Sequence, residues 1–506
     1  MRRLFWCGPA FAAFLFPVVA TAQDVTLTAR EGGLSVSGSL QGFDGEFYRI
    51  DSPYGLLTID ALGVVCDGPA CPDLSAPRID IRIKGLPGLG EQLLPGLFEA
   101  FAQNRGLIYA LQPFDGATYR ATLRDADSDQ TLADISFEPT TAEAAREALQ
   151  AGGAEFALSA APEPGFGQYA IALDAMVAIV APDNPIPRIS TKDLARILSG
   201  EVENWQDVGG PDMPLVLYGL AATEPLQKSL AARLGRDIAV TSEQPSLRSL
   251  ADTVARDPWS VAVTVKTVAG PARILPLTDS CGFPLLSTNL AVKAEDYPLA
   301  LPLHLVTPRR RLPLLAREFI EFLASPAAQR AISASGLVDR QPERQAMTSD
   351  GLRLINAIRG AGEETTLSDL QALVANMDGA DRLSLTFRFQ DGSSTLDGHS
   401  MSNLSDLARL IEAGVLRGSD ILLAGFSDGS GDAKANAALS ETRAIGVRDA
   451  LRALAPSLGT ADLPRVAGFG EALPTACDET AAGRRLNRRV EVWLTPPLRS
   501  NPATEN

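Results

Sequence analysis

The chain has 506 residues, with 45 lysines and arginines against 61 aspartates and glutamates, and a formal net charge of -16. This length is several times the ~100 to 200 residues of a typical domain, so two or three domains are expected. An acidic surface repels nucleic acid and anionic lipid, which excludes nucleic acid as a partner and means that any anionic ligand needs a local site.

Only two histidines occur, His304 and His399. Two histidines are few for a zinc site or for the general base of a Ser-His-Asp enzyme. We expect both to be ordinary structural or surface residues, and we expect no metal and no cofactor.

The first residues have the pattern of an export signal. Met1-Arg2-Arg3 is followed by an apolar run from Leu4 to Val19 and then by Ala20-Thr21-Ala22. A charged start, an apolar core and an A-x-A site are typical of a cleaved signal peptide. The run is shorter than the ~20 residues of a membrane-spanning helix. We therefore expect residues 1–22 to be removed after export.

Residues 23–76 contain short alternating runs broken by glycine and proline, as in Val25-Thr26-Leu27-Thr28 and Ser52-Pro53-Tyr54-Gly55. Alternation with period two between such turns predicts small β-hairpins. We expect a small β module here, and the sequence indicates no function for it.

Four cysteines follow the predicted cleavage site: Cys66, Cys71, Cys281 and Cys477. In an oxidising compartment they are candidates for disulfides rather than metal ligands. Cys66 and Cys71 could close a small loop, whereas the other two could pair with each other or stay free. Three full pairings remain open.

Apolar strands alternate with amphipathic helices across residues 77–340, as in Ile79 to Ile83 followed, after a glycine-rich turn, by Glu91 to Ala102. This alternation predicts an α/β domain.

Two segments of this domain resemble the middle of phosphate-type, PstS-like periplasmic solute-binding proteins. They are Ala-Leu-Asp-Ala-Met-Val-Ala-Ile-Val-Ala-Pro-Asp-Asn-Pro at 172–185 and a helix ending in Glu-Asn-Trp-Gln-Asp-Val-Gly-Gly at 194–210. Further similar pieces follow in the family order, at 258–263, 297–299 and 319–338. The resemblance implies a type II periplasmic binding protein fold, in which a hinge joins two α/β lobes.

The sequence departs from that family at the loops that would hold an oxyanion with hydroxyls and helix N-terminal N–H groups. Residues 85–90 contain no hydroxyl, and residues 218–224 lack the family's arginine. Glu91 and Glu224 would repel an anion if they pointed inward. The remaining candidates for solute contact are Gly88, Gly90, Ser159 and Thr223. Phosphate, another small solute, and a lobe pair kept as a scaffold for envelope protein partners all remain open.

Residues 341–380 are polar and helix-prone, with glycine and aspartate breaks, and we expect a tether or helical linker. A β-α-β-α-β series follows at 381–495. Its second strand ends in Gly425-Phe426-Ser427-Asp428, and Asn487-Arg488 precedes its last strand. Residues 496–506 are expected to be a tail.

The series resembles the OmpA C-terminal, peptidoglycan-associated family. The resemblance implies that Asp428 and Arg443 clamp diaminopimelate of the stem peptide. The free end of this residue carries an ammonium for the aspartate and a carboxylate for the planar arginine fork. The family's usual Gly-His-Thr-Asp is Gly-Phe-Ser-Asp here, so the imidazole is lost.

Four more residues complete the predicted peptidoglycan site. Asn436 and Ser440 lie at i-7 and i-3 from Arg443, so they could line or brace the same pocket. Asn487 and Arg488 form the family's closing signature and are equally suited to a structural role.

Three classes of function compete: a peptidoglycan-tethered solute-binding protein, a non-catalytic envelope organiser, and an enzyme. The sequence shows no nucleophile elbow, metal cluster or lone cysteine with a partner histidine, which argues against an enzyme. The two-lobed frame favours the binding protein, and the altered oxyanion loops favour the organiser. Of these two we lean toward the binding protein. We expect the protein in the periplasm, attached to peptidoglycan and associated with the outer membrane.

Overall fold

The computed structural model describes residues 25–30, 32–43, 46–71, 78–112, 118–349, 351–361, 365–390 and 395–497. These fall into two compact units: the described residues up to Ile79 together with Arg311–Glu318, and the rest of the described chain. The predicted signal peptide lies outside the described residues, as does most of the predicted tail.

The first unit contains a five-stranded antiparallel sheet in the order β4-β3-β2-β1-β5. Its strands are β1 (Val25–Ala29), β2 (Ser35–Phe43), β3 (Phe47–Ser52), β4 (Gly55–Asp60) and β5 (Val64–Asp67). Alternate residues Val25, Leu27, Tyr48 and Ile50 are buried on one face, as the period-two pattern predicts. Cys66 forms a disulfide with Cys71.

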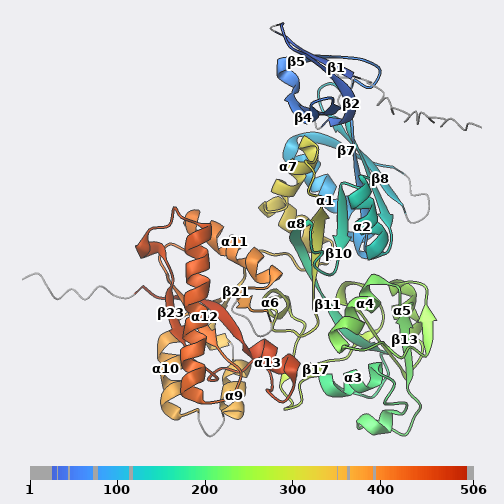
Figure 1. The fold of residues 1–506 in the computed structure, drawn as a ribbon. Coiled ribbons are helices and arrows are strands. Elements are labelled where there is room, and N and C mark those ends of the chain that lie inside the picture. Colours follow the sequence, from blue (N-terminus) through green and yellow to red (C-terminus); the bar gives the residue numbers. More distant parts are fainter. Residues whose placement is uncertain are drawn as a thin grey trace, which may run out of the picture. The chain divides into compact units, whose positions relative to one another are not determined.

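A large α/β domain begins the second unit (Figure 1). Its main sheet has eleven strands in the order β14-β13-β15-β11-β19-β10-β6-β9-β8-β7, with β16 paired to β11. These strands are β6 (Ile79–Gly85), β7 (Leu107–Leu111), β8 (Tyr119–Asp125), β9 (Thr131–Pro139), β10 (Phe156–Ser159), β11 (Gly167–Val180), β13 (Val216–Leu220), β14 (Ser242–Gln244), β15 (Ser260–Val265), β16 (Arg273–Ile274) and β19 (Ala300–Thr307).

The described residues of the α/β domain also form a small sheet and eight α-helices. The small sheet comprises β12 (Ile189–Ser190), β17 (Leu277–Thr278) and β18 (Pro284–Leu285). The α-helices are α1 (Leu89–Arg105), α2 (Ala142–Ala151), α3 (Thr191–Leu198), α4 (Pro225–Leu234), α5 (Leu247–Val254), α6 (Asn289–Lys293), α7 (Leu314–Phe322, whose residues up to Glu318 are counted with the first unit) and α8 (Pro326–Ala334).

Two long strands connect the lobes of this domain. The first part of β11 pairs with β19, and its last residues, Met176 to Val180, pair with β15. In the first lobe β19 pairs with β10, and β10 pairs with β6. In the second lobe β15 pairs with β13, and β13 pairs with β14. From Ala170 to Val180 every residue of β11 is buried, as expected for a strand covered on both faces. The fold is therefore two-lobed with a β11–β19 hinge.

The C-terminal domain has a five-stranded sheet in the order β20-β21-β24-β22-β23. β24 runs antiparallel to β21 and β22, and β22 runs parallel to β23. The elements are β20 (Arg344–Ala346), α9 (Gly351–Gly360), α10 (Leu367–Met377), β21 (Asp381–Arg388), α11 (Gly398–Glu412), β22 (Asp420–Phe426), α12 (Ala433–Leu454), β23 (Arg465–Gly468), α13 (Ala481–Asn487) and β24 (Arg489–Thr495).

Both faces of this sheet are covered. α11 and α12 contribute Leu404, Leu407 and Val447 to the core on one face. On the other face Leu373 and Met377 of α10 pack with Leu422 and Trp493. The segment 341–380, expected to be a tether or helical linker, is thus mostly helical and packs as a layer of this domain, and β20 adds an edge strand.

Both histidines are buried. Burial, with the neighbouring His399 and Arg340, lowers the pKa of His304 to about 4, so that His304 is neutral near pH 7. Among the described residues, no helix combines the length and the apolar character needed to cross a membrane.

Candidate functional site

The predicted peptidoglycan residues cluster at one end of the C-terminal sheet. β22 ends at Phe426, and the following turn leads to Asp432, which caps α12 by accepting from the Ala435 N–H at 2.8 Å. The parallel strand β23 ends at the same edge, and Gly470 in the loop after it accepts from the Ser427 N–H at 2.9 Å. The loops after both strands therefore border one site.

Asp428 lies in the first of these loops as an ionised acceptor. Its Oδ2 accepts from Arg488 Nη1 at 2.9 Å, and its Oδ1 accepts from the Ser430 N–H at 3.1 Å. Burial alone would raise the pKa of Asp428, but the hydrogen bonds from Arg488 and Ser430 outweigh burial and hold the pKa below its ordinary value. A carboxylate is thus available to a ligand ammonium near pH 7.

Arg443 on α12 has unused hydrogen-bonding capacity. Its Nη1 is buried without a hydrogen-bond partner among the described residues, and its guanidinium lies 5.6 Å from the centre of the Phe389 ring. Burial and the nearby Arg488 lower its pKa, while Asp428 raises it. A buried donor without a partner costs about 1–3 kcal/mol, more when it is charged, so a site that keeps one is suited to an external acceptor.

Asn436 and Ser440 brace this site from α12. The Asn436 amide donates to the Ser430 carbonyl at 3.2 Å and to Glu471 Oε1 at 3.0 Å. The fully buried Ser440 hydroxyl donates to the Ala437 carbonyl and accepts from the Gly470 N–H at 3.0 Å. Both residues therefore join α12 to the neighbouring loops.

Asn487 fixes the loop before α13. Its Oδ1 accepts from the N–H groups of Thr475 and Ala476 at 2.8 and 3.0 Å. Its Nδ2 donates to the Ala476 carbonyl and to Asp478 Oδ1. These four bonds use the hydrogen-bonding capacity of the Asn487 side chain, which is 1% exposed, so that Asn487 has a structural role. Arg488, in contrast, contacts Asp428 directly.

The four predicted solute residues lie in three places of the α/β domain: at the start of α1, at the end of β10 and in the turn before α4. Gly88 precedes α1 with φ 80°, and Gly90 lies inside α1, where a Cβ would come within 2.2 Å of the Phe137 ring. The Ser159 hydroxyl is engaged with Ala161, donating to its carbonyl at 2.7 Å and accepting from its N–H at 3.2 Å. Thr223 is exposed before α4. Packing against Phe137 thus requires a glycine at position 90, and the hydrogen bonds of the Ser159 hydroxyl are used within the turn to Ala161.

Glu91 lies in the first turn of α1, where the resemblance placed an oxyanion. Its Oε2 is buried with no partner among the described residues. Burial raises the pKa of Glu91, and hydrogen bonds from the backbone N–H groups of Gly88 and Glu91 itself partly offset this. An acidic side chain thus lies in the first turn of α1, where the helix dipole favours negative charge.

The two lobes also contact each other. Lys228 Nζ on α4 donates to Glu143 Oε1 on α2 at 2.8 Å. A Cβ on Gly88 would lie 3.5 Å from Leu247 Cδ1 at the start of α5. Residues of the first lobe thus contact residues of the second lobe directly.

Comparison with known families identifies both domains. A family model described as "PBP superfamily domain" matches residues 102–327, and the model of the OmpA family matches residues 388–488. The chain joins a PBP superfamily domain to an OmpA family domain. Both resemblances expected from the sequence are confirmed.

Two curated proteins match parts of the chain. The "Phosphate-binding protein PstS" of Borreliella burgdorferi is 25% identical over 186 residues, which are 35% of this chain and 67% of that protein. The "Probable lipoprotein YiaD" of Escherichia coli is 29% identical over 144 residues, which are 28% of this chain and 60% of that protein. The chain thus spans about three fifths of the second relative.

Solved structures that align with part of this chain include two from other bacteria. An ABC-type phosphate transport receptor from Vibrio cholerae has a TM-score of 0.40 at 17% identity and covers 51% of this chain and 99% of that one. PstS from Borrelia burgdorferi has a TM-score of 0.36 at 16% identity, with 51% and 98% covered.

Sequence reasoning missed two residues next to the OmpA site and used a third only as part of a motif. Asp478 Oδ2 accepts from the Gly429 N–H at 2.7 Å and so holds the turn that carries Asp428. The hydroxyls of Ser427 and Thr475 are buried without partners among the described residues. Ser427 belongs to the Gly-Phe-Ser-Asp motif, whereas no local signal distinguishes Thr475 or Asp478.

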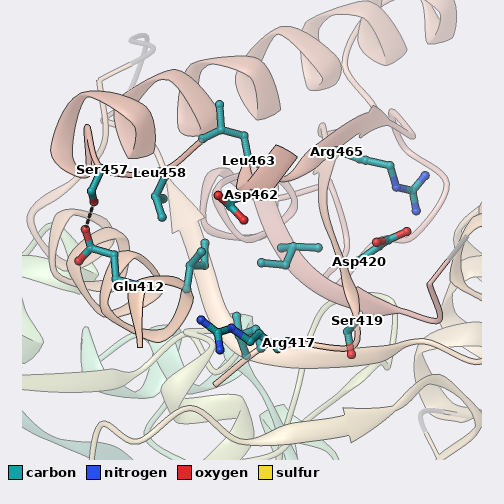
Figure 2. A pocket seen from close by; sticks show the side chains of 12 residues that line it. Glu412, Arg417, Ser419, Asp420, Ser457, Leu458, Asp462, Leu463 and Arg465 are labelled. Carbon is teal, nitrogen blue, oxygen red and sulfur yellow. Dashed lines mark hydrogen bonds between the residues drawn. The ribbon is translucent and has the colours of Figure 1, made fainter. Parts of the chain in front are cut away.

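A hollow of about 720 Å³ lies elsewhere on the OmpA domain (Figure 2). Its lining includes Arg417, Asp420, Asp462 and Arg465, at the ends where β22 and β23 begin. The predicted site lies where these strands end. None of the six predicted peptidoglycan residues lines this hollow.

Cys281 and Cys477 form a disulfide between the PBP and OmpA domains. With Glu479 they are the one group of described residues whose ligand atoms lie close enough together for a metal ion. Because the two sulfurs are bonded to each other, they offer no thiolate.

Proposed function

We propose that this protein is a non-catalytic envelope protein whose OmpA domain binds the diaminopimelate residue of peptidoglycan. Asp428 accepts hydrogen bonds from the ligand ammonium, and Arg443 donates to its carboxylate. The observation that carries the proposal is the buried, unpartnered Nη1 of Arg443 beside a carboxylate that Arg488 keeps ionised. A ligand carboxylate would supply the acceptor that Arg443 Nη1 lacks, and a ligand ammonium would share the Asp428 carboxylate with Arg488.

This role agrees with the pattern of residues 1–22 as a signal peptide, which would deliver the protein to the periplasm. The names of the relatives, a phosphate-binding protein and a lipoprotein, are consistent with an envelope location. Association with the outer membrane would follow from attachment to the peptidoglycan layer beneath it.

Binding to two kinds of cell wall tests the proposal. Sacculi with diaminopimelate should retain the full-length protein, whereas sacculi with lysine at that position should release it, because lysine lacks the second carboxylate that Arg443 would bind. Co-sedimentation at about 0.15 M salt measures retention while screening unspecific charge effects. Equal retention on both walls, or none on either, would refute the diaminopimelate assignment.

The PBP domain has a solute-binding fold, and we propose that it either binds a small solute other than free phosphate or serves as a contact scaffold for envelope proteins. Glu91 supports this proposal, because its carboxylate, with Oε2 buried, belongs to the first turn of α1, whose N–H groups a bound anion would need. A second negative charge beside it would be repelled in a site shielded from water.

Phosphate at about 10 mM should leave the melting temperature of the wild-type protein unchanged, since a ligand shifts stability only if it binds the folded state. Replacing Glu91 by serine removes the internal carboxylate and supplies a hydroxyl, and this variant should gain a phosphate-dependent rise of a few degrees. The matched variant Glu99→Ser, on the exposed side of α1, should gain none. A rise of several degrees in the melting temperature of the wild-type protein with phosphate would instead support a phosphate-binding function.

A shift with another member of a panel of oxyanions, amino acids and sugars would favour the solute-binding protein. The absence of any shift across that panel would favour the organiser.

A further inference from the structure

The loop that precedes α13 in the OmpA domain is attached to the PBP domain at one point by two bonds. Cys477 forms the disulfide with Cys281, and its backbone N–H donates to Asp279 Oδ2 at 2.7 Å. Asp279 is itself buried, and its Oδ1 accepts from the N–H groups of Cys281 and Phe283 at 3.0 and 2.7 Å. One carboxylate thus holds the backbone on both sides of the disulfide.

The next residue of this loop, Asp478, contacts the proposed peptidoglycan site. Its Oδ2 accepts from the N–H of Gly429, the neighbour of Asp428. Its Oδ1 accepts from Asn487, the neighbour of Arg488, at 2.8 Å. Asp478 therefore joins both halves of the Asp428–Arg488 pair, and it lies one peptide bond from the attachment to the PBP domain.

A second attachment joins the end of α13 to the PBP domain. Arg388 of β21 donates through Nη1 to the Leu486 carbonyl at 2.7 Å and through Nη2 to the Glu295 carbonyl, after α6, at 2.9 Å. Arg382 of the same strand pairs with Asp296 at 2.7 Å. Both arginines are at most 4% exposed. The end of α13, from which Asn487 and Arg488 follow, is thus held against the PBP domain by buried charge.

We propose that Asp279 and Cys281 of the PBP domain are positioning residues for the peptidoglycan site of the OmpA domain. Through Cys477 and Asp478 they set the turn of Asp428 against Arg488, so that affinity for the wall depends on residues of the other domain. This inference rests on the proposed function. Because coupling between two binding equilibria is reciprocal, an occupied wall site should in turn stabilise the contact between the domains.

The first measurement is the Kd of the full-length protein for a soluble muropeptide with diaminopimelate. The double variant Cys281→Ser with Cys477→Ser should bind about tenfold more weakly, which lies in the usual range for coupled sites. Asp279→Asn, which keeps the disulfide, should weaken binding in the same direction. The matched double variant Cys66→Ser with Cys71→Ser removes a disulfide of the other compact unit and should bind as the wild type does.

The second measurement is the rate at which a small dithiol reduces each disulfide. In this reaction the dithiol is oxidised to its own disulfide and passes two electrons and two protons to the protein, which gains two thiols. Saturating muropeptide should slow reduction of Cys281–Cys477 severalfold and leave Cys66–Cys71 unchanged. A merely structural disulfide would be reduced at the same rate with and without the muropeptide.

The outcomes separate this inference from the proposed function. If the wild-type protein does not bind the muropeptide, the proposed function fails. If the wild type binds, the inference is overturned when the Cys281/Cys477 variant binds equally well or when the muropeptide leaves the reduction rate of their disulfide unchanged.

Discussion

Replacing Glu491 by alanine is expected to destabilise the OmpA domain by about 4 kcal/mol, because it removes a buried anion that lies against three arginines, two of them buried. Glu491 is fully buried on β24 and accepts from Arg489 Nε at 2.6 Å. It also pairs with Arg353 of α9 and lies 3.4 Å from Arg382, and Trp493 Nε1 donates to its Oε2 at 3.0 Å. Burial alone would raise the pKa of Glu491, yet these arginines hold the pKa well below its ordinary value.

Urea unfolding followed by tryptophan fluorescence measures this loss. The matched variant Glu441→Ala, at an exposed position on α12, should change the free energy of unfolding by no more than about 0.5 kcal/mol. A Glu491→Ala protein whose unfolding midpoint matched that of the wild type would show that water, rather than Glu491, compensates the arginines.

Replacing Arg443 by alanine should weaken muropeptide binding about a hundredfold or more while leaving the melting temperature unchanged or higher. The loss arises because the ligand carboxylate would enter the site without its partner, which typically costs 2–5 kcal/mol, or about 30-fold to 4,000-fold. Stability should not fall, because the wild-type side chain keeps a buried Nη1 without a partner among the described residues. Calorimetric titration and thermal unfolding measure the two quantities on the same samples.

Two further variants sharpen this test. Arg443→Lys keeps the charge but loses the planar fork, so it should bind more tightly than Arg443→Ala and more weakly than the wild type. Arg452→Ala, at an exposed position in the last turn of the same helix, should bind normally. If Arg443→Ala bound as the wild type does, the unpartnered donor would have no part in ligand recognition.

Most of the fold could be predicted from short-range patterns. The run from Ala170 to Val180 in β11, apolar except for Asp174, and the alternation in β1 and β3 reflect the side-chain periods of buried and half-buried strands. The OmpA motif could likewise be found, because Asp428 and Arg443 stand on consecutive elements whose spacing in the chain is short.

The role of residues 341–380 could not be predicted in this way. Leu373 and Met377 are the buried residues of α10, and their spacing of four is compatible with a free amphipathic helix or a packed one. Whether such a helix packs depends on an apolar surface elsewhere, here provided by Leu422 and Trp493 on the second face of the sheet. A pattern within one segment contains no information about that surface.

The sequence by itself determined the two domain types and the order of their strands and helices, because side-chain periodicity and motif spacing are local properties. The tertiary structure alone decided how distant groups meet. It pairs Cys281 with Cys477 across 196 positions, and it brings Arg353 and the buried Arg382 against the buried Glu491. It also buries Glu91 Oε2 in the first turn of α1 without a partner among the described residues. Pairing and burial depend on which surfaces face each other after the chain has folded, and residue order along the chain does not specify this.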